Sequence, residues 1–191
     1  MSRQDLIIKP RIISGEFKGT RLDVAVDITR PITDRVKKTM FDILVDITYL
    51  ECLDLFAGSG SIGIEALSNG AKKVTFVDKS SDAIKVIKEN INKLEIEVER
   101  FNVIKLDYNA FLNASIQNKE RFDLIFIDPP FKNINRIKYD VLSELMDTKT
   151  ILILKVETGK NDYGTLEKLA ILDTRKIGKN TLIFYKKKES K

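Results

Sequence analysis

The sequence predicts an α/β fold in which a mostly parallel sheet carries helices on both faces. From residue 51 onward, short apolar runs typical of buried strands alternate with segments whose apolar residues recur at helical spacing. The chain then ends on two further apolar runs, at 169–175 and 181–185, and their short link leaves no room for a crossover helix. The last two strands must therefore be antiparallel to each other.

Seven segments have the composition of strands. Each is short and rich in β-branched or other apolar side chains, as expected inside a sheet. Because the first five alternate with helical segments, we expect those five to be parallel. In chain order the predicted strands cover residues 52–56, 74–77, 103–106, 123–127, 151–154, 169–175 and 181–185.

Helices are predicted in the intervals between the strands. In one of these intervals, Ile84, Ile87 and Ile91 fall on a single helical face. The predicted helices cover a segment around residues 62–67 and the segments 83–94, 109–116 and 137–146.

The first 48 residues are interpreted as a basic extension, made of a hairpin and a helix, ahead of a domain over residues 49–191. Pro31 disfavours helix at the residue before it, so an extended link precedes the helix. Thr33 or Asp34 then provides the helix cap.

Composition excludes several classes of protein. The 191 residues include no histidine, which excludes a Ser-His-Asp relay and any His-ligated metal site. The single cysteine, Cys52, excludes an internal disulfide and a thiolate zinc cluster, so we expect no metal. The chain has no apolar signal sequence and no uncharged run of the ~18 residues that span a bilayer. We therefore expect a soluble, cytoplasmic protein without a membrane partner.

A glycine-rich turn follows the first predicted strand. Residues 58–63 fit the pattern G-x-G-x-x-G, in which glycines allow close approach of a ligand to the backbone and to a helix N-terminus. Asp78 ends the next strand, 20 residues after Gly58, where a carboxylate can accept hydrogen bonds from ribose hydroxyls. Together Gly58, Gly60 and Asp78 predict a site for an adenosine-containing cofactor.

Two further acids bear on the choice of cofactor. Asp54 lies in the strand just before the turn, where an anion suits a sulfonium or ammonium ligand better than a pyrophosphate. The alternative is that Asp54 only caps amides of the turn. Asp107 ends the third strand and is a candidate acceptor for an adenine amino group. It is equally a candidate N-cap for the following helix, and the two roles are compatible.

The tetrapeptide Asp128-Pro129-Pro130-Phe131 directly follows the fourth predicted strand. Two prolines stiffen the turn, so the Asp128 carboxylate and the Pro129 carbonyl can serve as two aimed acceptors. An exocyclic amine has two N–H donors to match them, and Phe131 can stack on the base. The pattern predicts methyl transfer from a sulfonium to an amine. The alternative is a strand-terminating turn with a buried aromatic.

Basic residues gather at both ends of the chain, and the formal net charge is +5. The C-terminal lysines at 186–188 are interpreted as a solubilising terminus. The N-terminal cluster surrounds Gly15 and Gly19 and continues into the first helix, where ordered charges can present a fixed electropositive face to a phosphate backbone. It comprises Lys9, Arg11, Lys18, Arg21, Arg30, Arg35, Lys37 and Lys38.

Three stretches resemble the bacterial RsmD family. They are RIISGEFKG at 11–19, TRPITDRVK at 29–37 and LDLFAGSG at 53–60. The resemblance extends over residues 11–185 and implies a Rossmann-like class I methyltransferase with a seven-stranded sheet. It also implies transfer of a methyl group from S-adenosylmethionine to the N2 amine of a guanine in small-subunit (16S) ribosomal RNA, within a small-subunit particle. The chain departs from the family pattern at Ile32, where a polar residue is usual, at Phe131, where many relatives carry Tyr, and at Asp78, where Glu is frequent.

The resemblance assigns roles to individual residues. The cofactor would contact Asp54, Gly58, Gly60, Asp78 and Asp107. The catalytic corner that holds the guanine would be Asp128, Pro129, Pro130 and Phe131. The RNA contacts are expected at Arg11, Lys18, Arg21, Arg30 and Arg35.

Other functions remain open on the sequence alone. The Asp-Pro-Pro-aromatic motif is shared with DNA adenine methyltransferases, so DNA or another RNA is an alternative substrate. A nicotinamide-dependent oxidoreductase can be built on the same glycine turn, although an antiparallel ending is foreign to such a sheet. A non-catalytic RNA-binding module on a methyltransferase fold is the third alternative.

Overall fold

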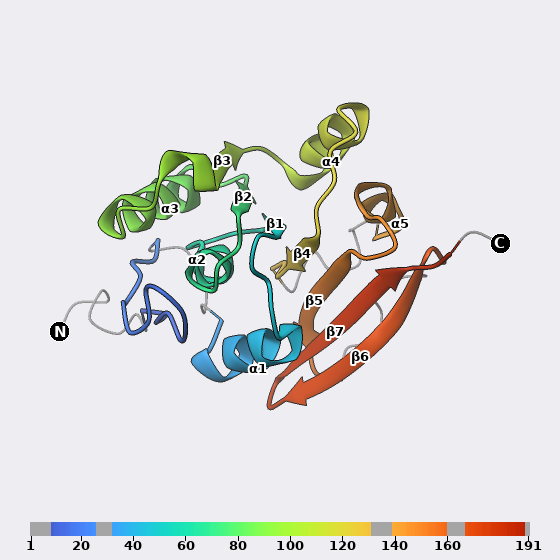
Figure 1. Ribbon diagram of the computed structural model, residues 1–191, viewed down its shortest axis with the longest axis horizontal. Helices are drawn as coiled ribbons and strands as arrows, with labels where there is room; N and C mark the ends of the chain where they lie inside the picture. The colour runs from blue at the N-terminus through green and yellow to red at the C-terminus, as the bar shows by residue number, and fades with distance from the viewer. Residues whose placement is uncertain (1–8, 26–31, 131–138, 160–166, 190–191) are drawn as a thin grey trace.

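The computed structural model describes residues 9–25, 32–130, 139–159 and 167–189. Its centre is one seven-stranded sheet with the strand order β3-β2-β1-β4-β5-β7-β6 (Figure 1). The strands are β1 (Glu51–Leu55), β2 (Lys73–Asp78), β3 (Phe101–Lys105), β4 (Leu124–Ile127), β5 (Ile151–Glu157), β6 (Leu169–Ile177) and β7 (Asn180–Lys187). All seven predicted strands are present, with ends shifted by a few residues.

Strand direction follows the prediction. β1 pairs in parallel with β2 and with β4, and the parallel set continues outward to β3 and β5. β7 is antiparallel to both β5 and β6. The mostly parallel sheet with an antiparallel C-terminal hairpin is therefore confirmed.

Helices cover both faces of the sheet, as alternation of strands and helices requires (Figure 1). On one face lie α1 (Asp34–Leu44), α2 (Ser61–Ser68) and α3 (Ser81–Lys93). On the other face lie α4 (Tyr108–Gln117) and the single turn α5 (Tyr139–Leu142). Within the described residues, no helix is long and apolar enough to cross a membrane.

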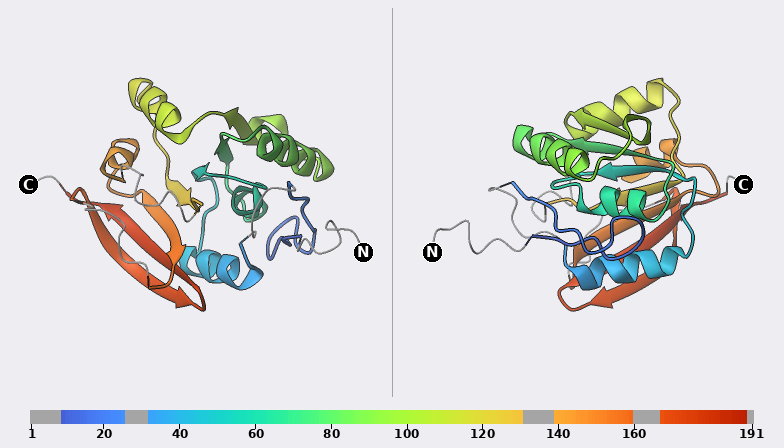
Figure 2. Two further views of the ribbon diagram at one scale, coloured as in Figure 1. Left: turned by 180° about the vertical axis from the view of Figure 1, so that it is seen from behind. Right: turned by 60° about the vertical axis from the view of Figure 1, so that its left-hand side comes forward.

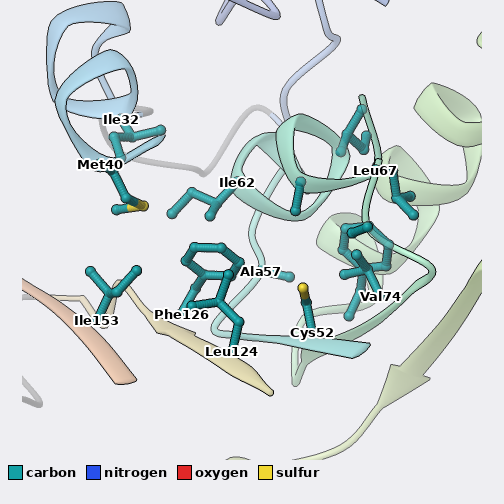
Figure 3. Close-up of a cluster of buried hydrophobic side chains, with 14 of the residues drawn as sticks. Ile32, Met40, Cys52, Ala57, Ile62, Leu67, Val74, Leu124, Phe126 and Ile153 are labelled. Carbon is teal, nitrogen blue, oxygen red and sulfur yellow. The ribbon is translucent and has the colours of Figure 1, made fainter. Parts of the chain in front are cut away.

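The strands contribute alternate side chains to two cores. In β4, Leu124 and Phe126 face the α1–α3 side, whereas Ile125 and Ile127 face the α4–α5 side. Figure 3 shows Phe126 among side chains from α1, α2 and β5. Ile32 is buried in this same core, which explains an apolar residue where the family pattern is polar.

One local prediction needs correction. The helix predicted at 137–146 is, in its described part, α5 followed by a 3₁₀ turn at Ser143–Leu145, and the chain is extended by Met146. The stretch around the N-terminal glycines is hairpin-like as predicted: an antiparallel bridge joins Arg11 and Arg21, and the Ile12 and Leu22 N–H groups donate to the carbonyl oxygens of Thr20 and Pro10. The cap of α1 is Thr33, whose hydroxyl accepts from the Val36 N–H.

The N-terminal segment packs on the α1–α3 side of the molecule, where the Glu16 N–H donates to the carbonyl oxygen of Ser68 in α2 (Figure 2). Ile12 and Leu22 are fully buried in the core that α2 also enters. At Gly15, whose φ is +74°, a Cβ atom would meet the Ser68 carbonyl oxygen at 1.8 Å, so only glycine fits. The division of the chain after residue 48 stays a prediction.

Candidate active site

Four acidic side chains lie at the carboxyl ends of neighbouring parallel strands. Because the order of these strands is β3-β2-β1-β4, the acids line one edge of the sheet, where open α/β sheets bind ligands. They are Asp107 after β3, Asp78 at the end of β2, Asp54 in β1 and Asp128 after β4.

The glycine-rich turn between β1 and α2 is built on left-handed backbone. Gly58 has φ +57°, and Gly60 has φ +75° as the N-cap of α2, with no side chain to cap the helix. Gly63 lies in the first turn of α2 directly over β2. A Cβ atom at Gly63 would meet Cε1 of Phe76 at 2.3 Å, so glycine brings the helix close to the sheet.

Asp54 is the most buried of the four acids. Its carboxylate is 1% exposed and accepts a hydrogen bond from the Gly63 N–H at 2.9 Å. Burial raises the pKa of the Asp54 carboxyl to about 7, the hydrogen bond from Gly63 opposes this, and the charges of Asp128 and Asp78 add to it. The predicted capping role is thus observed for Oδ2 of Asp54, which accepts from the Gly63 N–H. The carboxyl group is still buried, and a nearby cation would stabilise its ionised form.

Asp78 and Asp107 hold the loops around the turn. Asp78 accepts from the Gly58 N–H and from the Ser80 N–H, both at 2.9 Å, and so links the glycine turn to the loop that begins α3. Asp107 accepts from the Asn109 N–H at 3.0 Å as the N-cap of α4. The capping role predicted for Asp107 is confirmed, and its contact with an adenine stays a prediction.

The residues of this edge fit S-adenosylmethionine. Ser61 Oγ, in the first turn of α2, is buried and has no hydrogen-bond partner within the described residues, so a polar group is available for a ligand. Asp54 offers a buried anion to a cationic ligand, and the two left-handed glycines leave the backbone uncovered. Phe56 and Tyr108 add an aromatic pair whose ring centroids are 5.1 Å apart.

The Asp-Pro-Pro corner lies beside Asp54, because β4 pairs with β1. Asp128 is partly exposed, Pro129 is buried and Pro130 is exposed. Asp128 Oδ1 accepts a hydrogen bond from Lys155 Nζ at 2.6 Å, a contact that the sequence analysis missed. Phe131 lies outside the described residues.

A signal for the contact between Lys155 and Asp128 was nonetheless present in the sequence. Each residue directly follows an apolar run, and the two runs pair as parallel neighbours in the sheet.

The basic residues of the N-terminal region do not form one uniform face. Arg11, Lys18, Arg21 and Arg35 are exposed, and Arg11 is also paired with Asp34 at 3.3 Å. Arg30 lies outside the described residues.

The prediction that Lys37 belongs to an exposed basic cluster is wrong, because its side chain is fully buried against Glu65. Its ammonium donates to Glu65 at 2.9 Å and to the Arg11 carbonyl oxygen at 2.6 Å. Glu65 in turn accepts from the N–H groups of Ile13 and Ser14. Desolvation lowers the pKa of Lys37, and the Glu65 charge opposes the shift. This network fastens the N-terminal segment and α1 to α2.

The fold and this site together define a class of protein. A sheet of order 3-2-1-4-5-7-6 with one antiparallel hairpin, a glycine turn, a row of acids and an Asp-Pro-Pro corner are the features of a class I S-adenosylmethionine-dependent methyltransferase.

Comparison with known proteins identifies the family. The model of the family described as "Conserved hypothetical protein 95" matches residues 10–186. "Ribosomal RNA small subunit methyltransferase D" of Haemophilus influenzae is 41% identical over 154 residues, which are 79% of each chain. The chain therefore belongs to the RsmD family of ribosomal RNA methyltransferases.

Solved structures agree with this assignment. A structure from Haemophilus influenzae is 34% identical, with a TM-score of 0.77, and the match covers 95% of this chain and 99% of that one. A structure from Escherichia coli has a TM-score of 0.79 at 25% identity, and the match covers 94% and 98% of the two chains.

Proposed function

We propose that this protein transfers a methyl group from S-adenosylmethionine to the exocyclic N2 amine of a guanine in 16S ribosomal RNA. The relative from Haemophilus influenzae is named for methylation of small-subunit ribosomal RNA, and the chain shares its family. The observation that supports the site of transfer is the position of the Asp128 corner beside the acid-lined glycine turn, on adjacent strands β4 and β1.

The cofactor is held, in this proposal, by Asp54, Gly58, Gly60, Asp78 and Asp107. When bound, S-adenosylmethionine supplies a methyl group activated by a sulfonium. The buried Asp54 stabilises a positive ligand, because its own ionisation is costly without one. The glycines let the ligand approach the N-terminus of α2, where backbone N–H groups are not used within the helix.

The Asp128 corner orients the amine. One oxygen of Asp128 and the carbonyl oxygen of Pro129 each accept one N–H of the guanine amine, which directs the nitrogen lone pair toward the methyl group. Positive charge develops on that nitrogen during transfer, and the Asp128 carboxylate stabilises it. Proximity and orientation can supply up to about 7–11 kcal/mol of such a barrier. As the bond from nitrogen to the methyl carbon forms, the bond from that carbon to the donor sulfur would break and leave a neutral thioether. The nitrogen then gives one proton to solvent, which yields the N2-methyl guanine.

The RNA must present an unpaired base to this corner. A guanine in a loop or at an end leaves its stack at a cost of a few kcal/mol, less than one inside a duplex. In this proposal the flanking phosphates contact Arg11, Lys18, Arg21, Arg30 and Arg35, and of these the described residues Arg11, Lys18, Arg21 and Arg35 are exposed. A small-subunit particle is the proposed substrate.

Methyl transfer to isolated particles tests the proposal. Small-subunit particles that lack the modification are incubated with the protein and an isotope-labelled methyl donor, and the RNA is then digested to nucleosides for mass spectrometry. We expect label in N2-methylguanosine. Label in methylated adenosine would contradict the choice of base, and label in naked RNA but not in particles would contradict the choice of substrate.

A further inference from the structure

Lys155 is an unusual residue for its position in the sheet. It lies in β5, where it follows four apolar residues, and its side chain is only 8% exposed. Its ammonium lies 2.6 Å from Oδ1 of Asp128. Burying a lysine ammonium costs free energy unless it is paired, and a methionine would fill the same space without that cost.

The sheet itself fixes this pair. β4 and β5 are parallel, and Ile127 is the register partner of Leu154, so the next residues along the two strands are Asp128 and Lys155. Side chains alternate between the faces of a sheet, so both residues belong to the α1–α3 side, as do Phe126 and its neighbours (Figure 3). The pairing of strands β4 and β5 therefore brings the Lys155 ammonium to Asp128. The contact does not depend on the conformation of an exposed side chain.

The charges around this pair are mostly negative. Asp54 is fully buried, and the charges of Asp128 and Asp78 oppose its ionisation. Lys155 places a cation on Asp128 within this group of acids. It engages Oδ1 and so restricts the directions in which the carboxylate can accept a hydrogen bond from another partner.

We propose that Lys155 is a positioning residue for methyl transfer, which holds Oδ1 of Asp128 so that Oδ2 faces the incoming amine. This inference rests on the proposed function. The two acceptors offered to the amine are then one carboxylate oxygen and the Pro129 carbonyl oxygen, in a fixed arrangement that matches two N–H donors.

Orientation and electrostatics make opposite predictions for Lys155. Its positive charge disfavours the positive charge that develops on the amine nitrogen, so a purely electrostatic account predicts faster transfer without it. Orientation predicts slower transfer, because the carboxylate would rotate freely. A lower kcat without the Lys155 charge therefore indicates a positioning role, whereas a higher kcat indicates that only the electrostatic effect is present.

The test compares K155M, which keeps the size and removes the charge, with K155R, which keeps a charged donor. For K155M we expect kcat to fall by at least about tenfold. Its KM for RNA and Kd for S-adenosylmethionine should stay within about twofold of wild type. K155R should recover kcat to within about threefold of wild type. The matched control is K73M, since Lys73 lies at the opposite, amino end of parallel strand β2.

Several results would overturn the inference. They are an unchanged or increased kcat in K155M, a K155R variant as slow as K155M, or a comparable loss in K73M. Thermal unfolding checks that each variant is folded. If K155M does not fold, K155Q, which keeps a donor without charge, provides the same comparison. A wild-type protein that makes no N2-methylguanosine would instead contradict the proposed function.

Discussion

At the scale of single residues, Asp54 connects cofactor binding to pH. Burial raises its pKa to about 7 without a ligand, and a sulfonium or ammonium beside it would favour the ionised form. Binding must then release a proton at a pH below 7, so affinity for S-adenosylmethionine should rise with pH, by up to about tenfold per unit below 7, and level off above it. Calorimetry in buffers of different ionisation enthalpy measures both the affinity and the proton release.

The D54N variant is the control for this pH dependence, because it cannot ionise at that position. Its affinity for S-adenosylmethionine should be weaker than that of wild type and should not change between about pH 6 and pH 8.

In the ligand-free protein, the effect of Asp54 on folding stability has the opposite dependence on pH. The folded state holds a proton at Asp54 that the unfolded state, with a pKa near 3.8, has lost, so this group's contribution to stability falls as pH rises from 3.8 to about 7. Wild-type affinities for S-adenosylmethionine that are equal at about pH 6 and pH 8 would disprove the link between Asp54 ionisation and cofactor binding.

Asp128 carries the second prediction at this scale. D128N keeps the size of the side chain but replaces a charged acceptor oxygen, so it weakens the stabilisation of positive charge on the amine. We expect kcat to fall by about a hundredfold or more, while the Kd for S-adenosylmethionine changes by less than about threefold. Steady-state kinetics measure kcat, and equilibrium binding measures the Kd. Transfer at the wild-type rate would rule out the proposed mechanism.

At the scale of elements, the contact of α2 with β2 depends on Gly63. A Cβ atom there would meet the Phe76 ring at 2.3 Å, so G63A must push the helix away from the sheet. We expect a loss of about 1–3 kcal/mol in the free energy of unfolding, measured in urea. F76L supplies the matched background, since it makes room for the added methyl. If G63A costs as much in that background as in wild type, this packing explanation fails.

The buried pair of Lys37 and Glu65 joins α1, α2 and the N-terminal segment. K37M leaves a buried carboxylate without its cation, whereas Glu65 still accepts from the N–H groups of Ile13 and Ser14. We expect unfolding free energy to fall by roughly 3–5 kcal/mol, and the double variant K37M/E65L to lose less than the sum of the single losses. Urea unfolding of all three variants measures this, and additive losses would mean that the pair is not coupled.

At the scale of the whole molecule, local sequence patterns predicted most of the fold. Contacts between residues far apart in the sequence were harder to predict. The strands, their directions, the glycine turn and the acids at the strand ends follow from period and spacing, because each is encoded by adjacent residues. Lys37 looked exposed because it lies in a basic run, but it turns inward to Glu65, which is 28 residues away. Lys155 was missed because its partner, Asp128, is 27 residues away and becomes its neighbour only when β4 and β5 pair.

The proposed interaction with RNA also belongs to the scale of the whole molecule. Arg35 is exposed at the start of α1, next to the N-terminal segment that Lys37 and Glu65 hold in place. If it contacts a phosphate, R35A should weaken RNA binding several-fold and reduce the slope of log K against log salt by about 0.7–0.9. K72A is the matched control, because Lys72 is exposed at the amino end of β2 and paired with Glu51. Titrations of ribosomal RNA over a salt series measure both slopes. An R35A slope equal to that of wild type, or an equal loss in K72A, would remove Arg35 from the interface.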